Sequence, residues 1–117
     1  MRNAKLSEEL RRIVAAFGHA AHGLKVAWRQ RAFRIEIVLA LFLIPAALWL
    51  GHNRGLLIMS TLLVLMVELL NTAIETIIDR ISPEWHALSK DAKDLGSAVV
   101  LLSLLNAAMM WAVALWL

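Results

Sequence analysis

Four polar residues share one face of an otherwise apolar stretch, VELLNTAIETIIDR. Glu68, Asn71, Glu75 and Asp79 follow one another at intervals of three, four and four residues, which is α-helical spacing. Carboxylates among apolar side chains are costly to bury unless they are paired, protonated or bound to a cation. Glu68 lies inside LLVLMVELL with no basic residue nearby on its own helix. Its carboxyl group therefore suits a proton-accepting role.

The chemistry of this face has several possible readings. Proton relay, cation transport and lipid chemistry all fit, and the spacing alone does not choose among them. A carboxylate–amide face beside a lysine can also hold Mg²⁺ together with the phosphates of a nucleotide. The chain has no GxxxxGK[ST] phosphate loop, so a nucleotide site here must differ from those of soluble kinases. In simpler readings, Asp79 is a solvated helix end and Asn71 bonds a neighbouring helix, which contributes about 1 kcal/mol.

The elements that position these residues are predicted to be membrane helices. The chain has 117 residues, enough for one domain, and 61% of them are hydrophobic while 18% are charged. Ordinary soluble domains have roughly 45–50% and 25%. Apolar segments at about 31–50, 55–78 and 95–117 are long enough to cross a bilayer. The sequence therefore predicts an all-α integral membrane protein with three transmembrane helices, joined by GHNRG and by the polar stretch RISPEWHALSKDAKD.

Basic residues predict the orientation of these spans. Eight of the twelve Lys and Arg precede residue 35, three lie from Arg80 to Lys93, and Arg54 stands alone between them. Because cytoplasmic segments are enriched in Lys and Arg, the amino terminus and the second connection are expected in the cytoplasm. GHNRG and the carboxyl terminus are then expected on the far side of the membrane. Three tryptophans fall near that far interface: Trp49, Trp111 and Trp116.

The amino-terminal arm, at about 7–30, is predicted to be an amphipathic helix. Apolar residues recur there at intervals of three and four, with basic residues on the other faces. Ser7 is a plausible N-cap, and Gly18 and Gly23 are candidate breaks. A basic amphipathic helix beside a span is expected to lie in the cytoplasmic interface. With three spans following it, no nucleic-acid partner is expected.

Three stretches of the chain resemble the prokaryotic diacylglycerol kinases, small membrane enzymes with three spans and a surface helix. The longest is VELLNTAIETIIDRISPEWHALSKDAKDLGSA, and RRIVAAFGHAAHGLKVAW and AFRIE lie in the arm and the first span. Related undecaprenol kinases share much of this pattern. The resemblance implies a kinase that transfers the γ-phosphate of ATP to diacylglycerol with Mg²⁺ as cofactor. It also implies a homotrimer whose active sites are shared between neighbouring chains.

The resemblance also implies roles for individual residues. Glu68 corresponds to the catalytic base and Asn71 to its buried partner, while Glu75 and Gln30 fall on the two metal-binding positions. The nucleotide-binding positions fall on Arg12, His19, Glu75, Glu84, His86, Lys93 and Asp94. The lipid-binding positions fall on Arg12, Lys25, Trp28, Arg34, Glu36, Glu68 and Ser97.

Two positions depart from the family's pattern. His19 stands where the family has an aromatic residue. Gln30 stands where the family has a second metal-binding glutamate, and the spacing from Trp28 is one residue short. A glutamine offers a carbonyl oxygen to Mg²⁺ but no charge, so a weaker metal site is expected, with Glu36 or a water as a possible substitute. The alternatives to a diacylglycerol kinase are an undecaprenol or other lipid kinase, or a degenerate, non-enzymatic membrane homologue.

Overall fold

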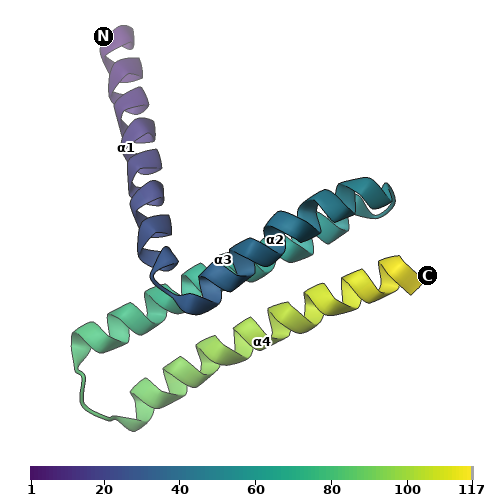
Figure 1. The fold of residues 1–117 in the computed structure, drawn as a ribbon. Coiled ribbons are helices and arrows are strands. Elements are labelled where there is room, and N and C mark those ends of the chain that lie inside the picture. Colours follow the sequence, from purple (N-terminus) through teal and green to yellow (C-terminus); the bar gives the residue numbers. More distant parts are fainter. Residues whose placement is uncertain (117) are drawn as a thin grey trace.

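The computed structural model describes residues 1–116, which form four helices. These are α1 (Arg2–Trp28), α2 (Arg31–Leu50), α3 (Arg54–Ile81) and α4 (Ala87–Trp116) (Figure 1). Within the described residues there is no strand, and α2, α3 and α4 are each long and apolar enough to cross a membrane. The predicted all-α fold with three membrane spans is therefore confirmed. Leu117, the expected end of the third span, lies outside the described residues.

Helix α1 is longer than the arm was expected to be. It begins at Arg2, and Ser7 lies inside it, where Ser7 Oγ donates a hydrogen bond to Ala4 O at 3.0 Å. The prediction that Ser7 caps the helix is therefore wrong. The helix also runs unbroken through Gly18 and Gly23. Glycine costs only about 1 kcal/mol in a helix, and the good helix formers around these two residues tolerate that cost.

The turn between α2 and α3 is set by two residues with left-handed backbone. Gly51 ends α2 with φ of 80°, and Asn53 precedes α3 with φ of 54°. Glycine and asparagine are the residues that adopt this conformation most readily, so GHNRG reverses the chain at little cost. His52 Nε2 lies 3.0 Å from Ala114 O, which ties this turn to the last turns of α4.

Helix α3 carries most of the buried residues of the bundle and packs against both α2 and α4. Three of its buried residues carry hydroxyls, and each donates to a backbone carbonyl three or four residues earlier. The acceptors are Leu57 O for Ser60 and Thr61, at 3.0 and 2.8 Å, and Glu68 O for Thr72, at 2.9 Å. Such bonds satisfy polar groups where no water is present.

The connection from α3 to α4 is shorter than the sequence indicated. Only residues 82–86 separate the two helices, because the polar segment from Ala87 to Asp94 forms the first turns of α4. The start of the third helix at about 95 is therefore wrong, although the apolar part begins there. Hydropathy marks where a helix enters lipid, whereas the helix itself begins at a cap. His86 supplies that cap: its Nδ1 accepts a hydrogen bond from Leu88 N at 3.1 Å.

The arrangement of the helices leaves wide apolar surfaces. Helices α2, α3 and α4 run along one another, while α1 projects away from them (Figure 1). At the end distant from α1, Ala47, Leu57 and Ala114 form the buried core. Trp111 is half-buried and its Nε1 donates to Thr61 Oγ1 at 3.3 Å, whereas Trp49 is 86% exposed. Trp111 therefore joins α3 to α4 instead of simply facing the headgroup layer.

Candidate active site

The polar face of α3 becomes progressively more exposed toward its carboxyl end. Glu68 is only 7% exposed, Asn71 and Glu75 are half-buried, and Asp79 is exposed. At 1.5 Å per residue, Glu68 lies about 11 Å deeper along the helix than Glu75. The face thus runs from a buried carboxyl group to a solvated one.

Glu68 meets a second carboxyl group from α2. The side chain of Glu36 lies close to that of Glu68, and Glu36 Oε2 is buried without a hydrogen-bond partner. Glu36 also lines a small apolar cavity of about 80 Å³ together with Thr61 and Val64. Two carboxyl groups that lie close together repel each other when both are ionised.

Asn71 stands between Glu75 and α4. Its Nδ2 donates to Glu75 Oε1 at 3.4 Å, while its Oδ1 is buried without a hydrogen-bond partner. The neighbour on the α4 side is Gly96, which is buried. The amide therefore fills the space between the two helices and reaches the carboxylate one turn further along α3.

An ion pair joins α3 to α4 near the connection between these two helices. Lys93 Nζ donates to Asp79 Oδ1 at 2.7 Å. Lys93 lies in the polar first two turns of α4, ahead of the apolar part of that helix. The hydrogen bond to Asp79 raises the pKa of Lys93, and the charge of Glu75 acts in the same direction. The ammonium group therefore remains protonated at neutral pH, beside two carboxylates.

A polar cavity of about 310 Å³ lies between the end of α3 and the start of α4. The exposed residues Glu84 and His86 line it from the connection. The charged residues that line it include Asp79, Lys93 and Asp94. Asp94 accepts a hydrogen bond of 2.6 Å from Lys90 Nζ. Because His86 Nδ1 accepts from the backbone, a neutral His86 carries its proton on Nε2, which is free to donate.

An apolar groove of about 650 Å³ lies on another side of α3, between α3 and α1. Thr72, which bonds to the backbone of Glu68, contributes to its wall. The other lining residues are Ala20, Gly23, Leu24, Val26, Ala27, Leu69, Ala73, Thr76 and Ile77. The polar residues of α3 thus have a polar cavity near one end and an apolar groove along the helix.

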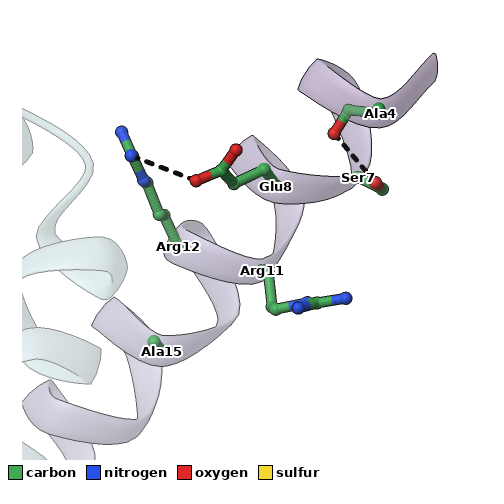
Figure 2. A pocket seen from close by; sticks show the side chains of 6 residues that line it. All are labelled: Ala4, Ser7, Glu8, Arg11, Arg12 and Ala15. Atoms are coloured by element: carbon green, nitrogen blue, oxygen red, sulfur yellow. Dashed lines mark hydrogen bonds and ion pairs between the residues drawn. The ribbon is translucent and has the colours of Figure 1, made fainter. Parts of the chain in front are cut away.

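Two of the predicted nucleotide-binding residues lie on α1, away from these cavities. Arg12 Nη2 donates to Glu8 Oε1 at 3.3 Å, and both side chains are exposed (Figure 2). The hollow around them is lined by residues of α1 alone. Arg12 lies sixteen residues before Trp28, about 24 Å along the helix, and His19 lies between them. Neither Arg12 nor His19 lines the polar cavity or the apolar groove.

The remaining candidates lie nearer to the junction of α1 and α2. Lys25 and Trp28 are exposed in the last turns of α1, and Arg34 is exposed in the first turn of α2. Gln30 precedes α2 with extended backbone, and its backbone nitrogen donates to Ala27 O at 2.9 Å. Across residues 1–116, no hydrogen bond joins the exposed side chain of Gln30 to Glu75.

The other predicted lipid contact is Ser97, which is exposed one residue beyond Gly96 on α4. No cluster of three or more His, Asp or Glu residues able to hold a metal ion occurs in the described part of the chain. The carboxylates of α3 are instead spread along the helix.

Comparison with known proteins decides the family. The family model for prokaryotic diacylglycerol kinase matches residues 18–115. The chain belongs to the prokaryotic diacylglycerol kinase family. The predicted family and the predicted activity, an ATP-dependent lipid kinase, are therefore confirmed.

Relatives of this kinase cover nearly the whole chain. A diacylglycerol kinase of Escherichia coli (strain K12) is 46% identical over 109 residues, which cover 90% of this chain and 89% of that protein. A diacylglycerol kinase of Pseudomonas aeruginosa is 46% identical over 110 residues, which cover 91% and 89%. One of Helicobacter pylori (strain 26695) is 39% identical over 105 residues, which cover 86% and 82%.

The structure adds features of this kinase that sequence reasoning missed. Gly96 was assigned no role, although it faces Asn71 directly. Asp79, for which a solvated helix end was one of the readings, is paired with Lys93. The signal for Gly96 was a single glycine, in DLGSA, at the entry to an apolar helix. The pairing of Asp79 could not be read from the sequence, because it depends on how tightly residues 82–86 turn the chain.

Proposed function

We propose that this kinase transfers the γ-phosphate of ATP to the free hydroxyl of diacylglycerol and produces phosphatidic acid where α3 and α4 meet. The observation that carries the proposal is the close approach of Glu36 to the buried carboxyl group of Glu68. This approach lies at the deep end of a polar face that leads to the polar cavity, and the apolar groove runs along the same helix. A lipid and a nucleotide can therefore approach the same carboxyl group from different sides.

Glu68 acts as the general base in this proposal. It accepts the hydroxyl proton as the lipid oxygen forms a bond to the γ-phosphorus, while the bond from that phosphorus to the bridging β,γ-oxygen breaks and ADP leaves. Burial in an apolar setting strengthens the interaction of the base with the hydroxyl. A general base of this kind contributes about 10²–10⁴-fold to the rate.

ATP binds in the polar cavity in this proposal, with Mg²⁺ carried on its phosphates. Mg²⁺ commonly takes only one or two protein carboxylates and fills its remaining positions with phosphate oxygens and water. Glu75 supplies one carboxylate near the cavity, so the residues present fit a cation that arrives with the nucleotide. Lys93 offsets phosphate charge, while the loop residues Glu84 and His86, with Asp94, contact the rest of the nucleotide.

Diacylglycerol enters from the bilayer through the apolar groove. Its acyl chains pack along the apolar wall between α1 and α3, which orients the hydroxyl toward Glu68. The polar head region is contacted by Lys25, Trp28, Arg34, Glu36 and Ser97, as the family resemblance implies. Holding both substrates in place supplies much of the catalysis that phosphoryl transfer needs, which suits so small a chain.

Arg12 and His19 serve the site of a neighbouring copy in this proposal. Arg12 lies about 24 Å along α1 from Trp28, and the three spans expose large apolar surfaces. A homotrimer with shared sites would place the outer part of α1 beside the next chain. In the bacterial inner membrane, α1 and residues 82–86 then lie on the cytoplasmic side, and the carboxyl terminus on the periplasmic side.

The test is product formation by the purified protein in mixed micelles. Radiolabelled ATP and Mg²⁺ are supplied with diacylglycerol, undecaprenol or ceramide, and the lipids are separated by thin-layer chromatography. We expect labelled phosphatidic acid to be the dominant product. Labelled undecaprenyl phosphate in its place would assign the chain to the related lipid kinases. No labelled lipid from any of the three would support the degenerate homologue.

A further inference from the structure

Gly96 lies where α4 passes closest to the polar face of α3. It is buried in the third turn of α4. A Cβ atom at this position would collide with Asn71 Oδ1 and would lie 3.2 Å from Asn71 Cγ. Any side chain at position 96 would therefore have to displace the amide of Asn71.

This steric requirement is confined to one glycine. A Cβ atom added at Gly18, Gly23, Gly51 or Gly55 would meet nothing within 4 Å. Small residues at helix contacts allow two backbones to approach closely in a membrane. At Gly96 the amide of Asn71 occupies the space that a side chain would otherwise fill.

The amide of Asn71 is placed by packing on one side and by a hydrogen bond on the other. Its Oδ1 is buried with no hydrogen-bond partner and lies against Gly96, at the position that a Cβ atom there would need. Its Nδ2 donates to Glu75 Oε1. Since no second hydrogen bond orients the amide, contact with Gly96 determines where it lies.

We propose that Gly96 is a positioning residue for the phosphoryl-transfer site. Because it has no side chain, Asn71 can lie against α4 and hold Glu75 in the orientation that binds the Mg²⁺ of MgATP. The inference rests on the proposed function, in which Glu75 binds that cation. Gly96 itself touches neither substrate, and it acts through Asn71.

The first test measures binding of MgATP. Purified protein in detergent micelles is titrated with Mg²⁺ and a non-hydrolysable ATP analogue. In Gly96→Ala we expect binding about tenfold weaker, the scale of losing one hydrogen bond to a charged group. In the Asn71→Ala background the same change should alter binding less than twofold, because the amide it displaces is already absent. Gly55→Ala, which has open space around it, is the matched control and should bind like the wild type.

The second test measures thermal unfolding of the same five proteins. Gly96→Ala should lower the unfolding temperature of the wild type. When Gly96→Ala is added to the Asn71→Ala variant, the unfolding temperature should stay the same or rise. Alanine at position 96 favours the helix, and the amide with which it would collide is absent. If Gly96→Ala alone does not fold, the double variant should still fold for the same reason.

Three results would overturn the proposal. The first is wild-type binding and stability in Gly96→Ala. The second is an equal loss with and without Asn71, which would mean that Gly96 serves the α3–α4 contact in general. The third is a double variant that fails to fold although Asn71→Ala folds. A Glu75→Gln variant that binds the analogue like the wild type would instead refute the metal role of Glu75, and the unfolding temperatures would still decide on Gly96.

Discussion

Lys93 Nζ lies 2.7 Å from Asp79 Oδ1 and thereby joins the start of α4 to the end of α3. The side chains are 42% and 64% exposed, so the pair itself contributes little to stability. Its position matters more than its strength, because both residues line the polar cavity at the helix connection. Asp79 therefore positions the ammonium group of Lys93, which in the proposed mechanism offsets the charge of the ATP phosphates.

Removing the charge of Asp79 should affect nucleotide binding more than turnover. In Asp79→Asn we expect the KM for ATP to rise by up to about fivefold, the scale of an exposed ion pair, with kcat nearly unchanged. Steady-state kinetics at saturating diacylglycerol measure both constants. Asp91→Asn, an exposed acid on α4 outside the pair, is the control. An unchanged KM in Asp79→Asn would mean that other groups position Lys93.

The sequence predicted the three spans well, because a bilayer demands long apolar helices whatever the rest of the fold does. It predicted helix ends poorly. The start of α4 depends on His86 accepting a hydrogen bond from Leu88, and that cap lies inside a stretch whose polarity suggests a loop. The unbroken course of α1 through Gly18 and Gly23 likewise reflects neighbouring residues more than the glycines themselves.

The polar face of α3 could be predicted because its members lie on one helix, where spacing alone defines neighbours. Contacts between helices could not. The approach of Glu36 to Glu68 depends on how α2 packs on α3. The close contact between Asn71 and Gly96, which leaves no room for a Cβ atom at position 96, depends on the separation of α3 and α4. The resemblance implied sites shared between chains, and the outward course of α1 gives a physical reason to test that idea.

The orientation in the membrane is open to direct labelling. The chain has no cysteine, so single cysteines report on one position each. We expect Arg54→Cys, in the turn between α2 and α3, to react with an impermeant thiol reagent added to whole bacterial cells. Asp91→Cys, at the start of α4, should react only after the cells are opened. The reverse pattern would place the polar cavity outside and remove its access to cytoplasmic ATP.

The departure at Gln30 predicts a specific Mg²⁺ dependence. A carboxylate attracts Mg²⁺ more strongly than a neutral oxygen, particularly where little water screens the charge. If this position reaches the metal in the assembled enzyme, Gln30→Glu should need less Mg²⁺ for half-maximal activity than the wild type. The measurement is a Mg²⁺ titration at saturating ATP and lipid. Equal Mg²⁺ requirements in the two proteins would exclude position 30 from the metal site.

The most direct measurement is phosphoryl transfer by Glu68→Gln. The substitution keeps the shape and hydrogen-bonding capacity of the side chain but removes the group that accepts the proton, so we expect activity to fall by about 10²–10⁴-fold. Binding of the non-hydrolysable ATP analogue and the unfolding temperature should stay close to those of the wild type. Glu9→Gln, which changes an exposed carboxylate on α1, should retain full activity. Near-normal turnover in Glu68→Gln would contradict the assignment of Glu68 as the base.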